Sequence, residues 1–169
     1  MFYLKIVTAL FILSFVSVTS WAQEEHCPPH PVTIQGNSLS PLIQNVDIVM
    51  MKPVSCVEKI MRSDFVIFHT GAHEQPVIKI VKALPGDSFN VVEGYIFVND
   101  EKLLTSNGEA YHLTENHSAM LLLYQRNYDG IVPPNSYIVL GDRPGGAIDS
   151  TRIGLIHRSD IIMTGGVSL

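Results

Sequence analysis

Two residues in this 169-residue chain have the types and surroundings needed for nucleophilic catalysis. Ser38 lies between Gly36 and Pro41 in a short turn-like stretch, and Lys79 lies in the middle of the apolar run 77–81. A serine hydroxyl is a poor nucleophile until a neighbouring base removes its proton, and a lysine can be that base only when neutral. The pair therefore predicts a hydrolase with a serine nucleophile and a lysine base.

The surroundings of Lys79 favour the neutral amine. Side chains alternate along a strand, so Lys79 shares a face with Val77 and Val81, while Ile78 and Ile80 point the other way. Both faces are apolar, and burial among apolar groups disfavours the charged ammonium and lowers the pKa of a lysine. The alternative is an edge-strand lysine whose amine reaches solvent.

Three short boxes occur in a fixed order along the chain. The first contains Gly36, Ser38, Pro41 and Asp47; the second contains Ile78, Lys79 and the stretch Leu84-Pro85-Gly86-Asp87; the third contains Gly141, Asp142, Asp149 and Ser150, with Gly154 following. Together the boxes, over about residues 32–163, resemble the type I signal peptidases, which use a serine and lysine pair. The resemblance implies that Ser38 is the nucleophile, that Lys79 is the base and that no cofactor is needed.

Supporting roles follow from the same resemblance. Gly36 and Asn37 would let the backbone bend so that the Ser38 amide helps to hold the oxyanion. Gly36 stands where the family can add a hydroxyl donor, so the oxyanion hole would depend on backbone alone.

The third box departs from the family pattern. Ala147 stands where the family has a serine that orients the lysine, which makes Ser150 the nearest substitute. We expect Asp142 to support the site as well, and Asp149 to anchor the box through an ion pair with Arg152.

The first 22 residues have the layout of a secretory leader. Lys5 is the only charge, residues 6–19 are apolar or hydroxylated, and Ser20 and Ala22 are small residues before a cut at Gln23. The alternative is a retained anchor in the inner membrane that faces the periplasm. The mature protein would otherwise be periplasmic or secreted, with an extended lead-in over 23–35 and the catalytic domain over 36–169.

Cys27 and Cys56 are the only cysteines, and an even number in an exported protein predicts a disulfide. Two buried free thiols are the alternative. The short length, the leader and the cysteine pair resemble the TraF-type peptidases of conjugative transfer, which mature pilin precursors.

The rest of the chain predicts a mainly β fold of short antiparallel strands. β-branched and aromatic runs separated by turn signals indicate strands at 46–51, 64–69, 77–83, 88–92, 95–98, 137–140 and 160–164. The polar segment 102–118 is interpreted as a loop or insertion. The run 119–124 favours a buried strand over a segment that touches a membrane.

Several classes of function are excluded or disfavoured. The formal net charge of −5 argues against nucleic acid as a partner, and the spacing of the seven histidines does not match a metal site.

The expected partners are a precursor protein or pilin with small residues before the cleavage site, and a membrane surface. Two alternatives are a catalytically impaired assembly factor of a conjugation or secretion system, and a GDSL-type esterase suggested by residues 36–39.

Overall fold

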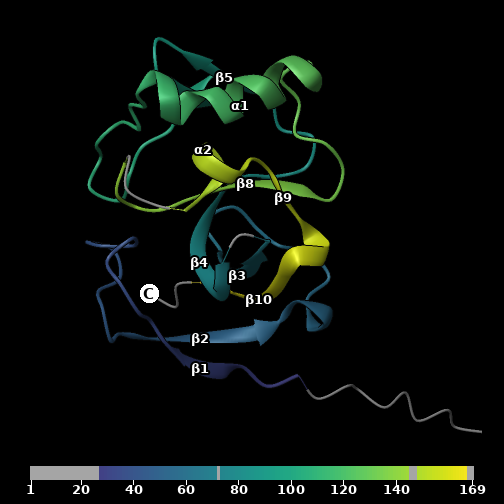
Figure 1. Ribbon diagram of the computed structural model, residues 1–169. Helices are drawn as coiled ribbons and strands as arrows, with labels where there is room; N and C mark the ends of the chain where they lie inside the picture. The colour runs from purple at the N-terminus through teal and green to yellow at the C-terminus, as the bar shows by residue number, and fades with distance from the viewer. Residues whose placement is uncertain (1–26, 72, 145–147, 167–169) are drawn as a thin grey trace, which may run out of the picture.

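The computed structural model describes residues 27–71, 73–144 and 148–166 (Figure 1). The leader predicted over residues 1–22 and Ala147 lie outside these residues. Among the described residues, no helix combines the length and the apolar composition needed to cross a bilayer.

A seven-stranded sheet forms the body of the fold, in the order β1-β2-β10-β3-β4-β8-β9. Its strands are β1 (His30–Thr33), β2 (Ile48–Pro53), β3 (Phe65–Thr70), β4 (His73–Ala83), β8 (Ser136–Leu140), β9 (Ile156–His157) and β10 (Ile161–Gly165). Every pairing in this sheet is antiparallel. The predicted mainly β fold of short antiparallel strands is confirmed, and residues 27–71, 73–144 and 148–166 do not form the α/β fold expected of a GDSL esterase.

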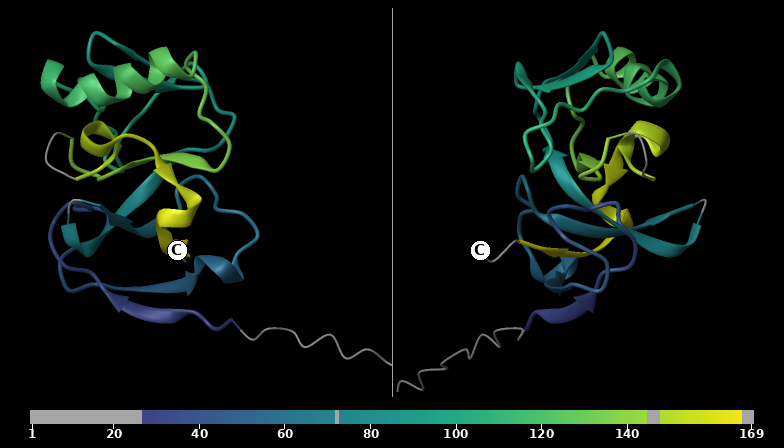
Figure 2. Two further views of the ribbon diagram at one scale, coloured as in Figure 1. Left: turned by 45° about the vertical axis from the view of Figure 1, so that its right-hand side comes forward. Right: turned by 90° about the vertical axis from the view of Figure 1, so that its left-hand side faces the viewer.

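A smaller sheet and a helix stack on one end of the larger sheet (Figures 1 and 2). The smaller sheet consists of β5 (Phe89–Val92), β6 (Tyr95–Val98) and β7 (Glu101–Lys102), and the helix is α1 (Glu115–Asn127). A single turn, α2 (Ser150–Ile153), and the 3₁₀ turns η1 (Val54–Cys56) and η2 (Arg158–Asp160) complete the described elements.

Each of the seven predicted strands overlaps an observed strand. The very short strands β7 and β9 and the N-terminal strand β1 were not predicted. β1 lies in the proline-rich stretch interpreted as an extended lead-in, and there it pairs with β2 in the register His30 to Met51 through Thr33 to Ile48.

The prediction of a strand at 119–124 is wrong, because these residues belong to α1. Their alanine, methionine and leucine side chains are unbranched at Cβ and favour a helix, whereas strands favour branched residues. The interpretation of 102–118 as a loop is wrong at both ends, since Lys102 belongs to β7 and α1 begins at Glu115. Only Ser118 and Leu121 of this helix are buried, so its apolar residues do not mark a regular helical face.

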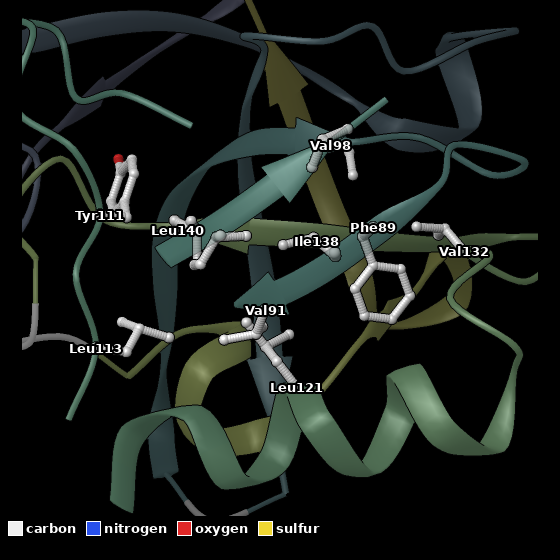
Figure 3. Close-up of a cluster of buried hydrophobic side chains, with 11 residues drawn as sticks. Phe89, Val91, Val98, Tyr111, Leu113, Leu121, Val132, Ile138 and Leu140 are labelled. Carbon is white, nitrogen blue, oxygen red and sulfur yellow. The ribbon is translucent and has the colours of Figure 1, made fainter. Parts of the chain in front are cut away.

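Three apolar clusters hold the layers together. The first lies between the smaller sheet, α1 and β8, where Leu121 meets Phe89, Val91 and Ile138 (Figure 3). The second includes Val66, Val81 and Val139 in the larger sheet. The third includes Leu39, Phe65 and Ile80, and therefore ties the residue after Ser38 to the strand that carries Lys79.

The predicted disulfide is confirmed. Cys27 and Cys56 are bonded, with their Cα atoms 5.8 Å apart, and no free cysteine occurs among the described residues. The bond joins the residues before β1 to η1, directly after β2. Arg158 donates to the carbonyl oxygens of Val54 and Val57, which holds the chain around η1 from the other side.

Candidate functional site

Ser38 and Lys79 meet in the folded chain. Lys79 lies on β4 opposite Val66 of β3, and Ser38 lies in the loop between β1 and β2. Lys79 Nζ is 2.8 Å from Ser38 Oγ and donates to the carbonyl oxygen of Ile78 at 2.6 Å. Lys79 is only 4% exposed, which excludes the alternative in which its amine extends into solvent.

Burial changes the pKa of the Lys79 amine. It lowers the pKa of Lys79 from 10.5 to about 8, and the negative charge of Asp149 opposes this by favouring the ammonium. A base with a pKa near the working pH can accept a proton and later return it. The structure therefore gives Lys79 the two properties that a general base needs, which are contact with the nucleophile and a reachable neutral form.

The loop that presents Ser38 is fixed by its own residues. Gly36 has φ +89°, a left-handed conformation that glycine adopts without strain, and its amide donates to Asn45 Oδ1 at 2.9 Å. Leu39 is 1% exposed in the third apolar cluster, and its carbonyl accepts from Ile43 N at 3.0 Å. The neighbouring buried leucine thus fixes Ser38, while Asn37 is exposed and its carbonyl accepts from Ser40 N at 3.2 Å.

Residues of the third box bind the loop that carries Ser38. The Asp142 amide donates to the Ser38 carbonyl oxygen at 2.8 Å. The next residue back, Gly141, is held on both sides: its carbonyl accepts from Tyr111 Oη at 2.7 Å, and its amide donates to Asp149 Oδ2 at 3.1 Å. Burial raises the pKa of the Tyr111 phenol, so its hydroxyl remains a donor.

Two of the predicted roles in this box are wrong in detail. Asp149 caps the amide of Thr151 at 3.0 Å and accepts from its hydroxyl at 2.7 Å, so it anchors the box without Arg152. Arg152 is exposed on the single turn of α2 and lies 3.1 Å from His117 Nε2 instead.

Ser150 does not take over the lysine-orienting role. Its hydroxyl is fully buried and accepts from the Val139 amide at 2.9 Å, so it fastens α2 to β8. The hydrogen bonds of Lys79 that the described residues provide go to Ser38 and Ile78.

A cleft of about 500 Å³ opens beside the pair. Two segments form its walls, 32–35 at the end of β1 and just after it, and 75–79 of β4; Ser38, Ile67 and Ile148 complete the lining. The side chains are mostly aliphatic. This shape suits an extended chain with apolar side chains that passes the serine and lysine.

Three residues near the site were missed from the sequence. Ser106 binds the Asp142 carboxylate, Tyr111 holds Gly141, and Lys82 donates to the Leu104 carbonyl at 3.2 Å and lies 5.2 Å over the Tyr111 ring. Burial lowers the pKa of Lys82, and the charge of Asp142 opposes this. Ser106 and Tyr111 lie in the segment without a recognisable motif, so no signal in the sequence pointed to them.

Comparison with known proteins identifies the family of the chain. The family described as "Signal peptidase, peptidase S26" matches residues 2–168. Signal peptidase I U of Bacillus subtilis (strain 168) is 26% identical over 136 residues, which cover 79% of this chain and 72% of that protein. The inactive signal peptidase IA of Staphylococcus aureus (strain COL) is 28% identical over 167 residues, which cover 98% and 85%.

A crystal structure of a signal peptidase I from Enterococcus faecalis V583 gives a TM-score of 0.42 at 19% identity, over 62% of this chain and 95% of that one. The family of the chain is shown by the sequence match. With a match over nearly its whole length, the chain belongs to the signal peptidase family, peptidase S26.

Proposed function

We propose that the protein is a serine endopeptidase that removes leader segments from exported precursor proteins, with Ser38 as nucleophile and Lys79 as general base. The observation that carries the proposal is the 2.8 Å contact between Ser38 Oγ and the Nζ atom of a buried lysine. The lowered pKa of Lys79 supports it, because an ordinary lysine would be protonated at neutral pH.

The chemistry follows from these two groups. Neutral Lys79 takes the proton of Ser38 as Oγ attacks the scissile carbonyl, and the Ser38 amide stabilises the oxyanion. The ammonium of Lys79 then returns the proton to the leaving amine, which departs and leaves an acyl-enzyme. Lys79 next takes a proton from water as its oxygen attacks the ester, and then returns that proton to Ser38 Oγ as the ester bond breaks and the acid product leaves. Gly36 contributes no side-chain donor to the oxyanion.

The cleft supports a substrate in extended conformation. Its two walls, residues 32–35 and 75–79, are long enough to flank several residues of a peptide, and the aliphatic lining disfavours charged side chains there. Small apolar residues before the scissile bond fit such a cleft best. A pilin precursor of a conjugation system is one candidate within this class.

Exposed apolar side chains in the loop after Ser38 and on β2 suit work at a membrane surface. Leu42 and Val46 in the loop after Ser38 are 39% and 70% exposed, and Ile48 and Met50 on one face of β2 are 65% and 49% exposed. Exposed apolar groups on two consecutive segments of the chain favour an interface or a lipid surface. A precursor still anchored by its leader would be presented at such a surface.

The experiment is the intact mass of a candidate precursor after incubation with the exported protein. The proposal expects a truncated product with wild type and none with Ser38→Ala or Lys79→Ala. A product lighter than the linear fragment by one water would show ring closure after cleavage. An unchanged precursor with all three proteins would refute the peptidase activity.

A second candidate, a catalytically impaired member that binds precursors without cleaving them, has one specific observation in its favour. Relatives that align over nearly the whole chain are named inactive signal peptidase IA. The serine and lysine at hydrogen-bond distance in this chain favour the active enzyme. Binding of an uncleaved precursor that is equally strong in wild type and Ser38→Ala would favour the second candidate.

A further inference from the structure

The loop between Leu104 and Ala110 is fastened to the third box. Leu104 and Ala110 form an isolated β-bridge, and Thr105 N donates to the Glu109 carbonyl at 2.8 Å, which closes the loop. At its start, Ser106 donates its amide to Asp142 Oδ1 at 2.8 Å and its hydroxyl to Asp142 Oδ2. One residue therefore supplies donors to both oxygens of this carboxylate.

Asp142 is buried, with 2% of its surface exposed. A buried carboxylate is costly unless donors satisfy its oxygens, so the two bonds from Ser106 fix the side chain in one orientation. The negative charge of Asp142 acts on the nearby Lys82, where it favours the ammonium against the effect of burial on the pKa. The amide of the same aspartate donates to the Ser38 carbonyl oxygen at 2.8 Å. A continuous series of hydrogen bonds thus joins the 104–110 loop to the backbone of the nucleophile.

We propose that Ser106 is a positioning residue for Ser38. By holding the Asp142 carboxylate, it fixes the Asp142 amide and through it the peptide group of Ser38, which sets Ser38 Oγ against Lys79 Nζ. The inference rests on the proposed peptidase function. Ser106 does not line the cleft beside Ser38, so its effect falls on the geometry of attack and not on peptide binding.

Ser106→Ala is a clean perturbation, because it keeps the amide donor and removes only the hydroxyl. Misplacement of a nucleophile by a fraction of an ångström costs about tenfold or more in rate. We expect kcat to fall by about tenfold with KM unchanged, and the pH at half-maximal kcat/KM to stay at the wild-type value. Ser106→Thr, which restores a hydroxyl, should recover most of the lost rate.

The matched control is Ser159→Ala, which removes an exposed hydroxyl from η2 and should keep the wild-type kcat. Melting temperatures of all variants separate a loss of folding from a loss of positioning, and rates are measured well below them. A wild-type kcat in Ser106→Ala would overturn the proposal. So would a kcat that Ser106→Thr fails to recover, or a loss that appears in KM alone.

Hydrogen exchange at the Asp142 amide gives a readout that needs no cleavage. The bond to Ser38 should protect this amide, and Ser106→Ala should speed its exchange while Ser159→Ala leaves it unchanged. If wild type cleaves nothing, the proposed function fails, and faster exchange in Ser106→Ala would still show that Ser106 holds the Asp142–Ser38 contact. Unchanged exchange in Ser106→Ala would refute the positioning role whatever the activity.

Discussion

The rate of cleavage should follow the protonation of Lys79. With its pKa lowered by burial to about 8, the amine is neutral in about one molecule in ten at pH 7 and in about nine in ten at pH 9. We expect kcat/KM to rise about tenfold per pH unit below pH 7, to reach half its maximum near pH 8 and to level off above pH 9. A fluorogenic leader peptide assayed from pH 6 to 10 would measure this profile.

The same burial makes a prediction for stability that needs no substrate. The folded-state pKa of Lys79 lies below the unfolded value of 10.5, so the unfolded chain binds more protons between about pH 8 and 10.5 and the free energy of unfolding rises with pH there. At pH 7 the protonated lysine costs up to about 3 kcal/mol. Lys79→Met should therefore stabilise the protein at pH 7 and lose that advantage by pH 10.5, whereas exposed Lys59→Met should change little.

Two results would refute this reasoning. One is a kcat/KM profile with its midpoint near pH ~6.5, typical of histidine, that disappears in His69→Ala or His73→Ala while Lys79→Ala stays active. The other is a Lys79→Met protein that is less stable than wild type at pH 7 in urea titrations, because the buried charge would then be compensated by more contacts than the described residues provide.

Three further predictions concern a charge near Lys79, the disulfide and a glycine after α2. Asp149→Asn keeps an acceptor and removes the charge that favours the ammonium, so the kcat/KM profile should shift to lower pH; an unmoved or higher midpoint would contradict this. Reduction of Cys27–Cys56 should destabilise the protein by about 3–4 kcal/mol in urea titrations. It should also raise KM, because β1 leads into one wall of the cleft, and an unchanged KM would remove the disulfide from substrate binding. Gly154→Ala should lower stability by about 2–4 kcal/mol in thermal unfolding, because the glycine has φ +83° and an added Cβ would lie 2.3 Å from the Tyr124 ring; a stability change below 1 kcal/mol would show that the ring moves aside.

The sequence predicted the larger sheet well because its strands carry strong local signals. Runs such as 64–69 and 77–83 are β-branched and aromatic and end at turn residues, so their conformation is visible without knowledge of the fold. β9 is only two residues long and has no such signal. α1 was missed because its three successive leucines, of which only Leu121 is buried, hide the helical period.

The site residues also fall into those with a signal in the sequence and those without one. Ser38 and Lys79 were found from their chemistry and from the boxes around them, and the structure brings them together. Ser106 was not found, because serine in a polar segment has no local signal and its role depends on the fold that places it against Asp142. The partner of Asp149 was predicted wrongly for a related reason: the carboxylate is used by the nearest backbone and hydroxyl donors, which compete with any ion pair.

The central claim is that Ser38 and Lys79 act as one unit in peptide cleavage. The most direct test compares single-turnover cleavage of one precursor by wild type, Ser38→Ala, Lys79→Ala and the double variant. Shared action in one proton transfer predicts that each single variant loses essentially all activity and that the double variant is no slower. Lys79→Arg should be equally inactive, because a guanidinium stays protonated. Measurable turnover by Lys79→Arg, or losses that multiply in the double variant, would contradict the account.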